Sequence, residues 1–255
     1  MGDSLLQPHI QCSKLHATPY ALLPGDPGRV DKVKAYLSQV QEIAFNREYK
    51  SIRGEYKGIK VMVVSTGIGG TSTGIAVEEL HNIGVHTMIR IGSCGALNKH
   101  IHLGELILVN GAVRDEGTSK AYISPIYPAI PDTNLLMNLI QTARAHDYPH
   151  HIGKVRSHDS FYTDDEERID QYWASKDILG SDMETAVLFV IGALRGVHTA
   201  SILNTVVTYE GELNEDINQY VSRESKTVKG EENEILLALE TLVKWDQEKR
   251  GISNE

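Results

Sequence analysis

One arginine stands inside an apolar run, where a charge is costly to bury. Arg90 lies within the strand-like residues 87–91, and Gly92 and Ser93 directly follow this run. A buried guanidinium needs an anion beside it, which either a structural salt bridge with a core carboxylate or a bound phosphate would supply. The phosphate interpretation also explains the adjacent Gly-Ser pair, because backbone N–H and hydroxyl groups bind anions. We therefore take Arg90 and Ser93 as candidate ligands of a phosphate-sized anion.

Two further glycine-rich segments follow apolar runs. PGDPG (24–28) comes after residues 20–23 and precedes Arg29, and TGIGG (66–70) comes after residues 60–65. Each alone is more often a plain turn than an anion site. Because the carboxyl ends of parallel strands meet at one edge of a sheet, we expect the three glycine segments to lie together there. Neither the GxxxxGK[ST] loop nor a dinucleotide-binding GxGxxG with its following acid occurs.

Two carboxylates, Asp182 and Glu184, open a strongly apolar stretch that predicts a helix over Thr185–Leu194. Carboxylates favour helix N-termini, so a structural role is one interpretation. In the other, Glu184 accepts hydrogen bonds from two sugar hydroxyls, for which its two oxygens are suited. The residues alone leave both interpretations open.

Strand-like and helix-like stretches alternate along the chain. We predict further strands at residues 105–109, 151–157 and 199–207, a helix after Ser72 or Thr71, and a closing amphipathic helix over residues 234–245. This alternation predicts an α/β fold with one domain, residues 1–255, in which a mixed, mostly parallel sheet is flanked by helices. Residues 214–229 are polar and charged, which predicts a loop or mobile helix near the site.

Composition excludes several functional classes. The net charge is −9 without a Lys/Arg cluster, which argues against nucleic-acid binding. Since no apolar run reaches the roughly 18 residues of a transmembrane helix, we expect no membrane contact. Two cysteines without CxxC spacing indicate a reduced, cytoplasmic protein, with Cys94 packed rather than nucleophilic. We interpret His146, His150 and His151 as surface histidines rather than a metal site.

Five segments spread over nearly the whole chain carry a family resemblance. They are LLPGDPGRV (22–30), NREYKS (46–51), STGIGGTSTGIAVEEL (65–80), IRIGSCGAL (89–97) and SDMETA (181–186). In this order they resemble the hexameric nucleoside phosphorylases, which include uridine and purine nucleoside phosphorylases. The resemblance implies the nucleoside phosphorylase fold and a pentosyltransferase that splits a ribonucleoside into free base and ribose 1-phosphate. Inorganic phosphate would be the co-substrate, with no organic cofactor.

The resemblance also implies which residues bind phosphate. Gly25, Arg29, Arg90 and Ser93 match the phosphate ligands that one subunit contributes, and Arg90 is expected to act in catalysis. Arg47 matches an arginine that reaches the phosphate of a neighbouring subunit. Three cations around the nucleophile argue against a nucleosidase, which would use water instead.

The ribose would be held by Met183 and the catalytic Glu184, with Asp182 where relatives usually carry Glu. His9 matches a histidine that crosses the dimer interface to the 5′-hydroxyl. Because two residues would serve a neighbour's site, the resemblance implies a homo-oligomer, at least a dimer and in this family a hexamer. A potassium ion at a subunit interface is also implied, with ligands at Glu48, Ile68 and Ser72.

Departures from the family pattern concern the base. Purine-cleaving relatives carry an aspartate that protonates the leaving base, and this chain has Val206, Val207 or Thr208 in its place. The nearest carboxylate is Glu210. These residues count against an ordinary purine phosphorylase.

The pyrimidine pattern is also incomplete. Phe161 and Tyr162 match the pair that places an aromatic ring on the base, and Glu166 and Arg168 align with the glutamine and arginine that hold uracil. A second arginine of the uridine enzymes is missing. The balance favours uridine by a small margin over two alternatives, a purine phosphorylase with a displaced acid and a non-catalytic nucleoside-binding homologue.

Overall fold

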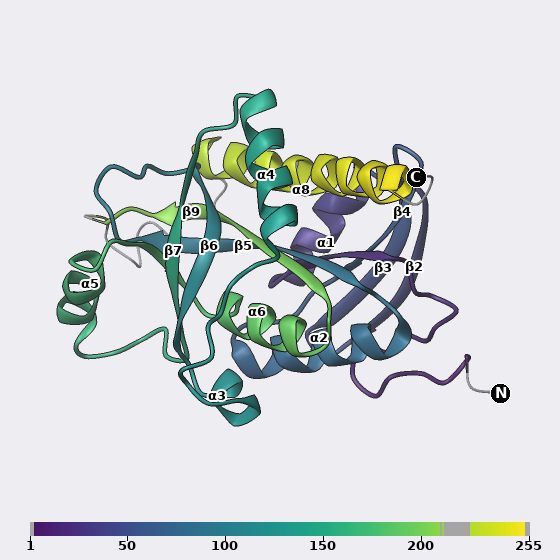
Figure 1. Cartoon of the computed structure of the whole chain (residues 1–255), viewed down its shortest axis with the longest axis horizontal. Helices are drawn as coiled ribbons and strands as arrows, with labels where there is room; N and C mark the ends of the chain where they lie inside the picture. The colour runs from purple at the N-terminus through teal and green to yellow at the C-terminus, as the bar shows by residue number, and fades with distance from the viewer. Residues whose placement is uncertain (1–2, 210, 212–224, 253–255) are drawn as a thin grey trace.

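One mixed sheet runs through the structure, a computed structural model that describes residues 3–209, 211 and 225–252 (Figure 1). Its strands are β1 (Tyr20–Pro24), β2 (Ser38–Asn46), β3 (Tyr49–Tyr56), β4 (Ile59–Val64), β5 (Thr87–Ala96), β6 (Leu106–Asp115), β7 (His150–His158), β8 (Ile178–Asp182) and β9 (His198–Val207). The order is β2-β3-β4-β1-β5-β8-β7-β6-β9, and β9 also pairs with β5. The last five strands therefore close on themselves.

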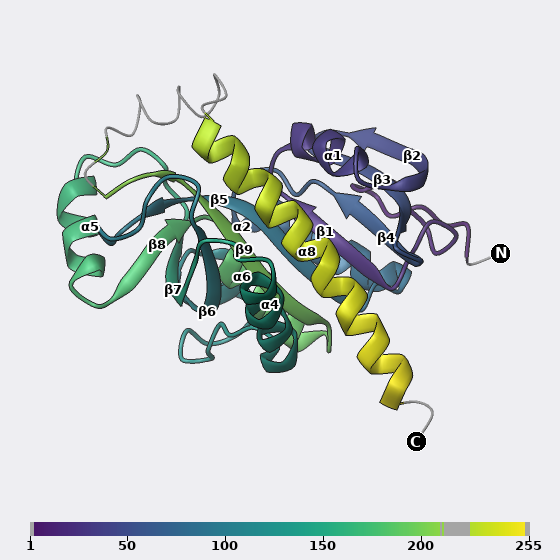
Figure 2. The same ribbon diagram turned by 90° about the horizontal axis from the view of Figure 1, so that it is seen from above.

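Helices cover both faces of the sheet (Figures 1 and 2). They are α1 (Pro27–Lys34), α2 (Gly70–Ile83), α3 (Thr118–Tyr122), α4 (Thr133–Ala145), α5 (Glu166–Ala174), α6 (Thr185–Leu194) and α8 (Ser225–Ile252). In Figure 1, α1, α4 and α8 lie on one face, and α2, α3 and α6 on the other. The α5 helix stands apart at the end of the molecule away from the β2–β3 hairpin.

The strand β1 shows why this sheet needs two helix layers. Successive side chains of a strand point to opposite faces. Tyr20 and Leu22 pack into the core shared with α1, α4 and α8, whereas Ala21 and Leu23 pack into the core shared with α2 and α6. The strand β1 is therefore apolar on both faces, as expected of a strand in a parallel sheet with helices on each side, and it lies at the centre of the molecule.

The predicted mixed, mostly parallel sheet flanked by helices is confirmed. Parallel pairs join β1 to β4 and β5, β5 to β9, and β7 to β6 and β8. The predicted helix Thr185–Leu194 is found with the same bounds. In the described part of the chain, no helix is both long and apolar enough to cross a membrane.

Several local predictions were wrong. The glycine segment that begins at Gly92 is not a turn, because the strand β5 continues through it to Ala96. Ser181 and Asp182 end the strand β8 rather than open a helix. The helix α2 begins at Gly70, so neither Thr71 nor Ser72 caps it. In contrast, residues 214–229 were predicted to form a loop or a mobile helix, and residues 225–229 are helical, whereas 214–224 lie outside the described residues.

Candidate active site

The carboxyl end of β1 and the loop after β4 form one hydrogen-bonded unit. Thr66 donates its backbone N–H to Pro24 O at 2.8 Å, and Gly67 donates to Gly25 O at 3.0 Å. A Cβ on Gly25 would lie 3.3 Å from Gly67 O and 3.9 Å from Nη1 of Arg90. Gly25 therefore leaves open the space beside the Arg90 guanidinium.

Arg90 is buried, with 4% of its surface exposed, and two of its three guanidinium nitrogens are paired. Nε donates to Asp182 Oδ2 at 3.0 Å, and Nη2 lies 2.5 Å from Glu184 Oε2. Nη1 is buried and has no hydrogen-bond partner among the described residues. A structural salt bridge thus accounts for Nε and Nη2 only. Because an unpaired buried N–H costs about 1–3 kcal/mol, Nη1 beside Gly25 fits an anion ligand.

Glycine at position 92 is required by the path of the Arg90 side chain. A Cβ on Gly92 would lie 2.5 Å from both Arg90 Cζ and Nη2. The guanidinium therefore folds back over its own strand and lies against the backbone of Gly92. This local packing explains why a glycine follows the arginine after one intervening residue.

Arg29 approaches the same place from α1. The helix begins with Pro27, and the side chain of its N-cap, Asp26, accepts a hydrogen bond from Gly28 N. The buried Arg29 donates from Nη2 to Ser93 Oγ and from Nη1 to Ile91 O, both at 2.9 Å. The predicted phosphate ligands Gly25, Arg29, Arg90 and Ser93 are thus brought together, although they come from two segments that lie about sixty residues apart in the sequence.

The two carboxylates at the end of β8, Asp182 and Glu184, have different roles. Asp182 accepts hydrogen bonds from Ser157 Oγ at 2.6 Å and from Thr185 N at 3.0 Å, in addition to Arg90. It therefore stabilises the start of α6 and orients the arginine. Glu184 makes no capping hydrogen bond to its own helix and accepts instead from Gly69 N at 2.6 Å. Both residues lie at the start of α6, but only Asp182 hydrogen-bonds to the helix terminus, whereas the Glu184 side chain is directed to Gly69.

Glu184 is 5% exposed, and burial raises the pKa of its carboxyl group, while Arg90 opposes that rise. Met183, half-buried, precedes it at the end of the strand. The carboxylate thus lies beside the guanidinium that has the open N–H group. A polyol placed here would meet a hydrogen-bond acceptor next to an anion site.

The residues expected to serve a neighbouring subunit gather around the turn between β2 and β3. Arg47, exposed at φ +56°, forms this turn with Glu48. Asn46 Nδ2 donates to His9 O at 2.8 Å, and His9 Nδ1 lies 2.6 Å from Glu79 Oε1. The structure therefore brings His9 and Arg47 into one surface region.

The predicted potassium ligands lie where the turn between β2 and β3 meets the start of α2. Ser72 Oγ donates to Ile68 O at 3.1 Å, and the side chain of Glu48 lies against Gly67. The three predicted ligands are therefore close together. Among the described residues, no cluster of three or more His, Cys, Asp or Glu side chains could hold a metal ion.

The predicted base-binding residues are much more exposed. Phe161 and Tyr162 are 37% and 75% exposed, with ring centroids 5.0 Å apart. Glu166 and Arg168 belong to α5, a helix without buried residues. The Arg168 side chain is 76% exposed and donates to Asp165 Oδ2 at 2.6 Å. The structure does not bring these two polar residues onto the buried part of the site.

The end of β9 supplies an apolar wall where a purine enzyme would need an acid. Val206 and Val207 are 6% and 7% exposed, and Val207 pairs in register with Gly95 of β5. Glu210, the nearest carboxylate in sequence, lies outside the described residues. Cys94 is buried, which raises the pKa of its thiol to about 12, so the expected packed role is confirmed.

Sequence reasoning missed two acidic residues behind the predicted phosphate ligands. Glu231 and Glu234, both on α8, pack their carboxylates against the Arg29 guanidinium. Their spacing of three residues places them on one helix face, which is the only local signal of a shared role. Their partner is distant in sequence, so no local pattern could identify it.

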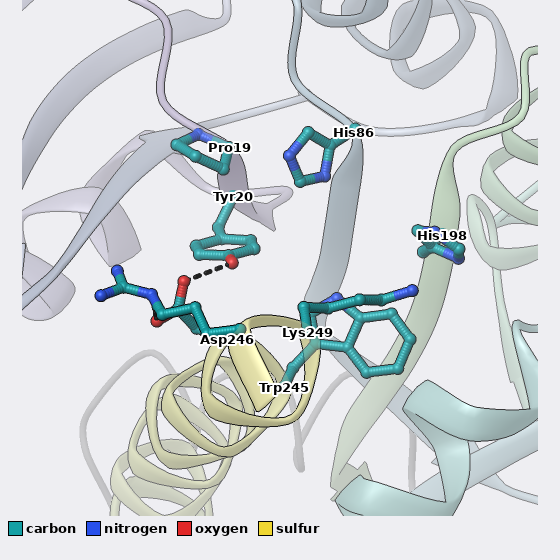
Figure 3. A pocket seen from close by; sticks show the side chains of 8 residues that line it. Pro19, Tyr20, His86, His198, Trp245, Asp246 and Lys249 are labelled. Atoms are coloured by element: carbon teal, nitrogen blue, oxygen red, sulfur yellow. Dashed lines mark hydrogen bonds and ion pairs between the residues drawn. The ribbon is translucent and has the colours of Figure 1, made fainter. Parts of the chain in front are cut away.

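A separate hollow of about 560 Å³ lies at the opposite, amino-terminal ends of the central strands. Figure 3 shows Tyr20, His86, His198 and Trp245 around it. Tyr20 donates its hydroxyl to Asp246 Oδ1 at 2.7 Å, and His198 Nδ1 lies 2.7 Å from Asp132 Oδ2. These polar groups pair with one another, and the hollow lies away from the predicted phosphate ligands. It is therefore not part of the candidate site.

An anion site beside a carboxylate acceptor, at the carboxyl ends of parallel strands, is the arrangement expected of an enzyme that brings phosphate to a sugar. The chain belongs to the Phosphorylase superfamily, which residues 19–230 match. The resemblance to nucleoside phosphorylases is thereby confirmed.

Named relatives and solved structures support this assignment. A uridine phosphorylase of Thermococcus kodakarensis is 36% identical over 96% of this chain and 89% of its own. A guanosine phosphorylase of Halorubrum lacusprofundi is 39% identical over 77% of this chain and 81% of its own. The crystal structure of uridine phosphorylase from Vibrio fischeri ES114 is 46% identical and has a TM-score of 0.89, covering 96% of this chain and all of that one.

Proposed function

We propose that this chain is a nucleoside phosphorylase that uses phosphate to cleave uridine into uracil and ribose 1-phosphate. The observation that carries the proposal is the buried Nη1 of Arg90, which has no hydrogen-bond partner in the part of the chain that the structure describes. It lies beside Gly25 and on the same guanidinium as the contact to Glu184. A phosphate oxygen would pair with Nη1, and a ribose hydroxyl would donate to Glu184.

The geometry suggests how the reaction proceeds. Arg29, Arg90 and Ser93 would fix the phosphate below the sugar, and Glu184 with Met183 would fix the ribose ring. Cleavage of the glycosidic bond develops positive charge on the ribose, which a fixed phosphate oxygen stabilises as it attacks. Holding the two reactants in alignment removes up to roughly 7–11 kcal/mol of entropic barrier.

The identity of the base rests on the wall beside Gly95. A purine leaves most readily when an acid protonates its ring, and Val206 and Val207 offer no acid at this wall. Uracil can leave as an anion that hydrogen bonds to its carbonyl groups stabilise. Phe161 would stack on the ring, and Glu166 and Arg168 would supply polar contacts after turning from solvent onto the substrate.

We also propose that the active unit is a cytoplasmic homo-oligomer, at least a dimer and in its full form a hexamer. Arg47 and His9 would complete the site of a neighbour, and a potassium ion would bind at Glu48, Ile68 and Ser72. Two exposed apolar side chains near these residues, Phe45 at 65% and Ile68 at 80%, would be covered by the contact.

Mixing two inactive variants tests the shared site. Arg47→Ala and Arg90→Ala chains should each be inactive alone, because each homo-oligomer lacks one phosphate ligand in every site. In a mixed oligomer, an Arg47→Ala chain keeps its own Arg90 and receives Arg47 from an Arg90→Ala neighbour. Variants that are refolded together should therefore regain activity. Activity that stays absent from mixtures of proven composition would exclude the shared site.

The activity test measures base release from uridine, inosine, adenosine and guanosine, each with and without phosphate. Phosphate-dependent release from uridine alone is the expected result. Release from purine nucleosides would show that another group acts as the acid, and the guanosine phosphorylase relative makes guanosine the substrate to include. No release from any of them would leave the non-catalytic nucleoside-binding alternative.

A further inference from the structure

The phosphate ligand Arg29 is held from behind by two carboxylates of α8. Nε donates to Glu231 Oε1 at 2.8 Å, and Nη1 lies 3.2 Å from Glu234 Oε1. Both carboxylate side chains are buried, with 3% exposure for Glu231 and 0% for Glu234. The guanidinium therefore lies between these carboxylates and Ser93, to which Nη2 donates.

The two carboxylates differ in how their charge is compensated. Glu231 also pairs with Lys32 of α1. Glu234 has no such second cation, and neither of its oxygens makes a hydrogen bond among the described residues. The ion pair with Arg29 is thus the main compensation for its charge.

The groups that face Glu234 come from each element packed around it. They are Arg29 and Lys32 of α1, Glu231 of α8, and Arg90 and Cys94 of β5. Burial raises the pKa of Glu234 to about 8, and Arg29 opposes this rise. Burial acts in the same direction on Glu231, but Arg29 and Lys32 hold the pKa of Glu231 below its ordinary value.

We propose that Glu234 controls the phosphate affinity of this site, because its ionised carboxylate and a bound phosphate compete for the positive charge of Arg29. The proposal rests on the phosphate site described under the proposed function. Both anions would approach one guanidinium in a buried region, where charges interact more strongly than in water. Linkage is reciprocal, so phosphate binding must favour the protonated form of Glu234 to the same extent.

The sign of the pH dependence follows. Below pH 8 Glu234 is mostly protonated, so its carboxyl group is neutral and does not compete with phosphate for the Arg29 guanidinium. Above pH 8 the carboxylate forms and phosphate binding weakens. If only the protonated form binds, the apparent KM for phosphate should rise about tenfold between pH 7 and pH 9, because the competent fraction falls to about a tenth.

The kinetic test compares the unsubstituted protein with Glu234→Gln, which cannot ionise. Because inorganic phosphate itself changes charge over this range, the KM for phosphate of the unsubstituted protein is divided by that of the variant at each pH. This ratio should rise about tenfold from pH 7 to pH 9, and the KM for uridine should show no difference in pH profile between the two proteins. Glu232→Gln is the matched control, since Glu232 is exposed and pairs with Lys229 on the same helix. It should keep the tenfold rise.

Calorimetry with inorganic phosphate gives a readout that needs no turnover. At pH 8.5, titrations in two buffers of different ionisation enthalpy should show proton uptake on phosphate binding to the unsubstituted protein. The uptake should be lost in Glu234→Gln. Equal uptake in both proteins, or an unchanged KM profile, would overturn the role of Glu234 while leaving the phosphorylase proposal intact. Absence of any phosphate binding to the unsubstituted protein would overturn both.

A stability measurement checks the same group without ligand. The unfolded chain releases the Glu234 proton near pH 4.5, whereas the folded chain keeps it up to about pH 8. Folding then retains a proton, so stability falls as pH rises between these values. The Tm of the unsubstituted protein should therefore fall more between pH 5 and pH 8 than that of Glu234→Gln. An identical fall in both would contradict the burial of a protonated Glu234.

Discussion

Arg90 and Arg168 are both expected to contact substrate, yet 5% of one side chain and 76% of the other is exposed. Arg90 is held by two carboxylates and by the backbone of Gly92. Arg168 contacts Asp165, its neighbour on an exposed helix. Buried contacts of the folded chain thus fix the side chain of Arg90, whereas the side chain of Arg168 is largely in solvent.

This contrast divides the site into two regions. The inner region comprises Gly25, Arg29, Arg90, Ser93, Asp182 and Glu184. The outer region comprises His9, Arg47, Phe161, Tyr162, Glu166 and Arg168. The inner residues are positioned by the fold itself, which suits the phosphate and sugar that every substrate shares. Under the proposed function, the outer residues would be ordered by the substrate or by a neighbouring chain, so base preference could change there without disturbing the core.

The largest expected effect comes from Arg90→Lys. Lysine keeps a positive charge near Asp182 and Glu184 but cannot reach both carboxylates and the phosphate, because it lacks the planar fork. By analogy with losing a preorganised donor, we expect kcat/KM for phosphate to fall about 1000-fold. Steady-state kinetics would measure the fall in kcat/KM. Arg195→Lys is the control, because Arg195 forms an exposed ion pair with Glu78. A loss below tenfold would remove Arg90 from the inner region.

A second, smaller effect is expected from Gly92→Ala. The new Cβ would lie 2.5 Å from Arg90 Cζ, so the guanidinium must move although its charge remains. A displacement of this kind costs about 100-fold in kcat/KM. Gly251→Ala is the control, because a Cβ there meets open space. Activity equal to the unsubstituted protein would mean that the inner region tolerates movement and that the contrast between the regions is false.

The smallest effect is expected from Arg168→Ala. Removing one charged hydrogen bond to the base should raise the KM for uridine about tenfold. The KM for phosphate and the Tm should stay unchanged, because the side chain contributes no buried contact. Arg144→Ala, another exposed arginine at a helix end, is the control. A fall in Tm, or a loss as large as that of Arg90→Lys, would show that α5 belongs to the rigid part of the molecule.

Local sequence patterns predicted the central elements well. The run at residues 199–207 corresponds to β9, His198–Val207, and residues 20–23 to β1, Tyr20–Pro24. Residues 20–23 and 199–207 are all buried in the structure, and both runs are rich in apolar side chains, which makes them recognisable as strands of a sheet covered on both faces. The hairpin β2–β3 was missed because β2 is mostly exposed and its turn at Arg47 contains no glycine. The α5 helix was missed because it buries no residue.

The sequence by itself determined the central strands and singled out Arg90 and Ser93 as candidate anion ligands. An arginine within an apolar run and glycines at strand ends are local features, and burial makes them conspicuous. Only the tertiary structure decided which charges pair. Arg90 meets Asp182 across 92 positions, and Arg29 meets Glu231 across 202. Such pairs depend on how helices and strands close in space, and local periodicity carries no information about a partner that distant.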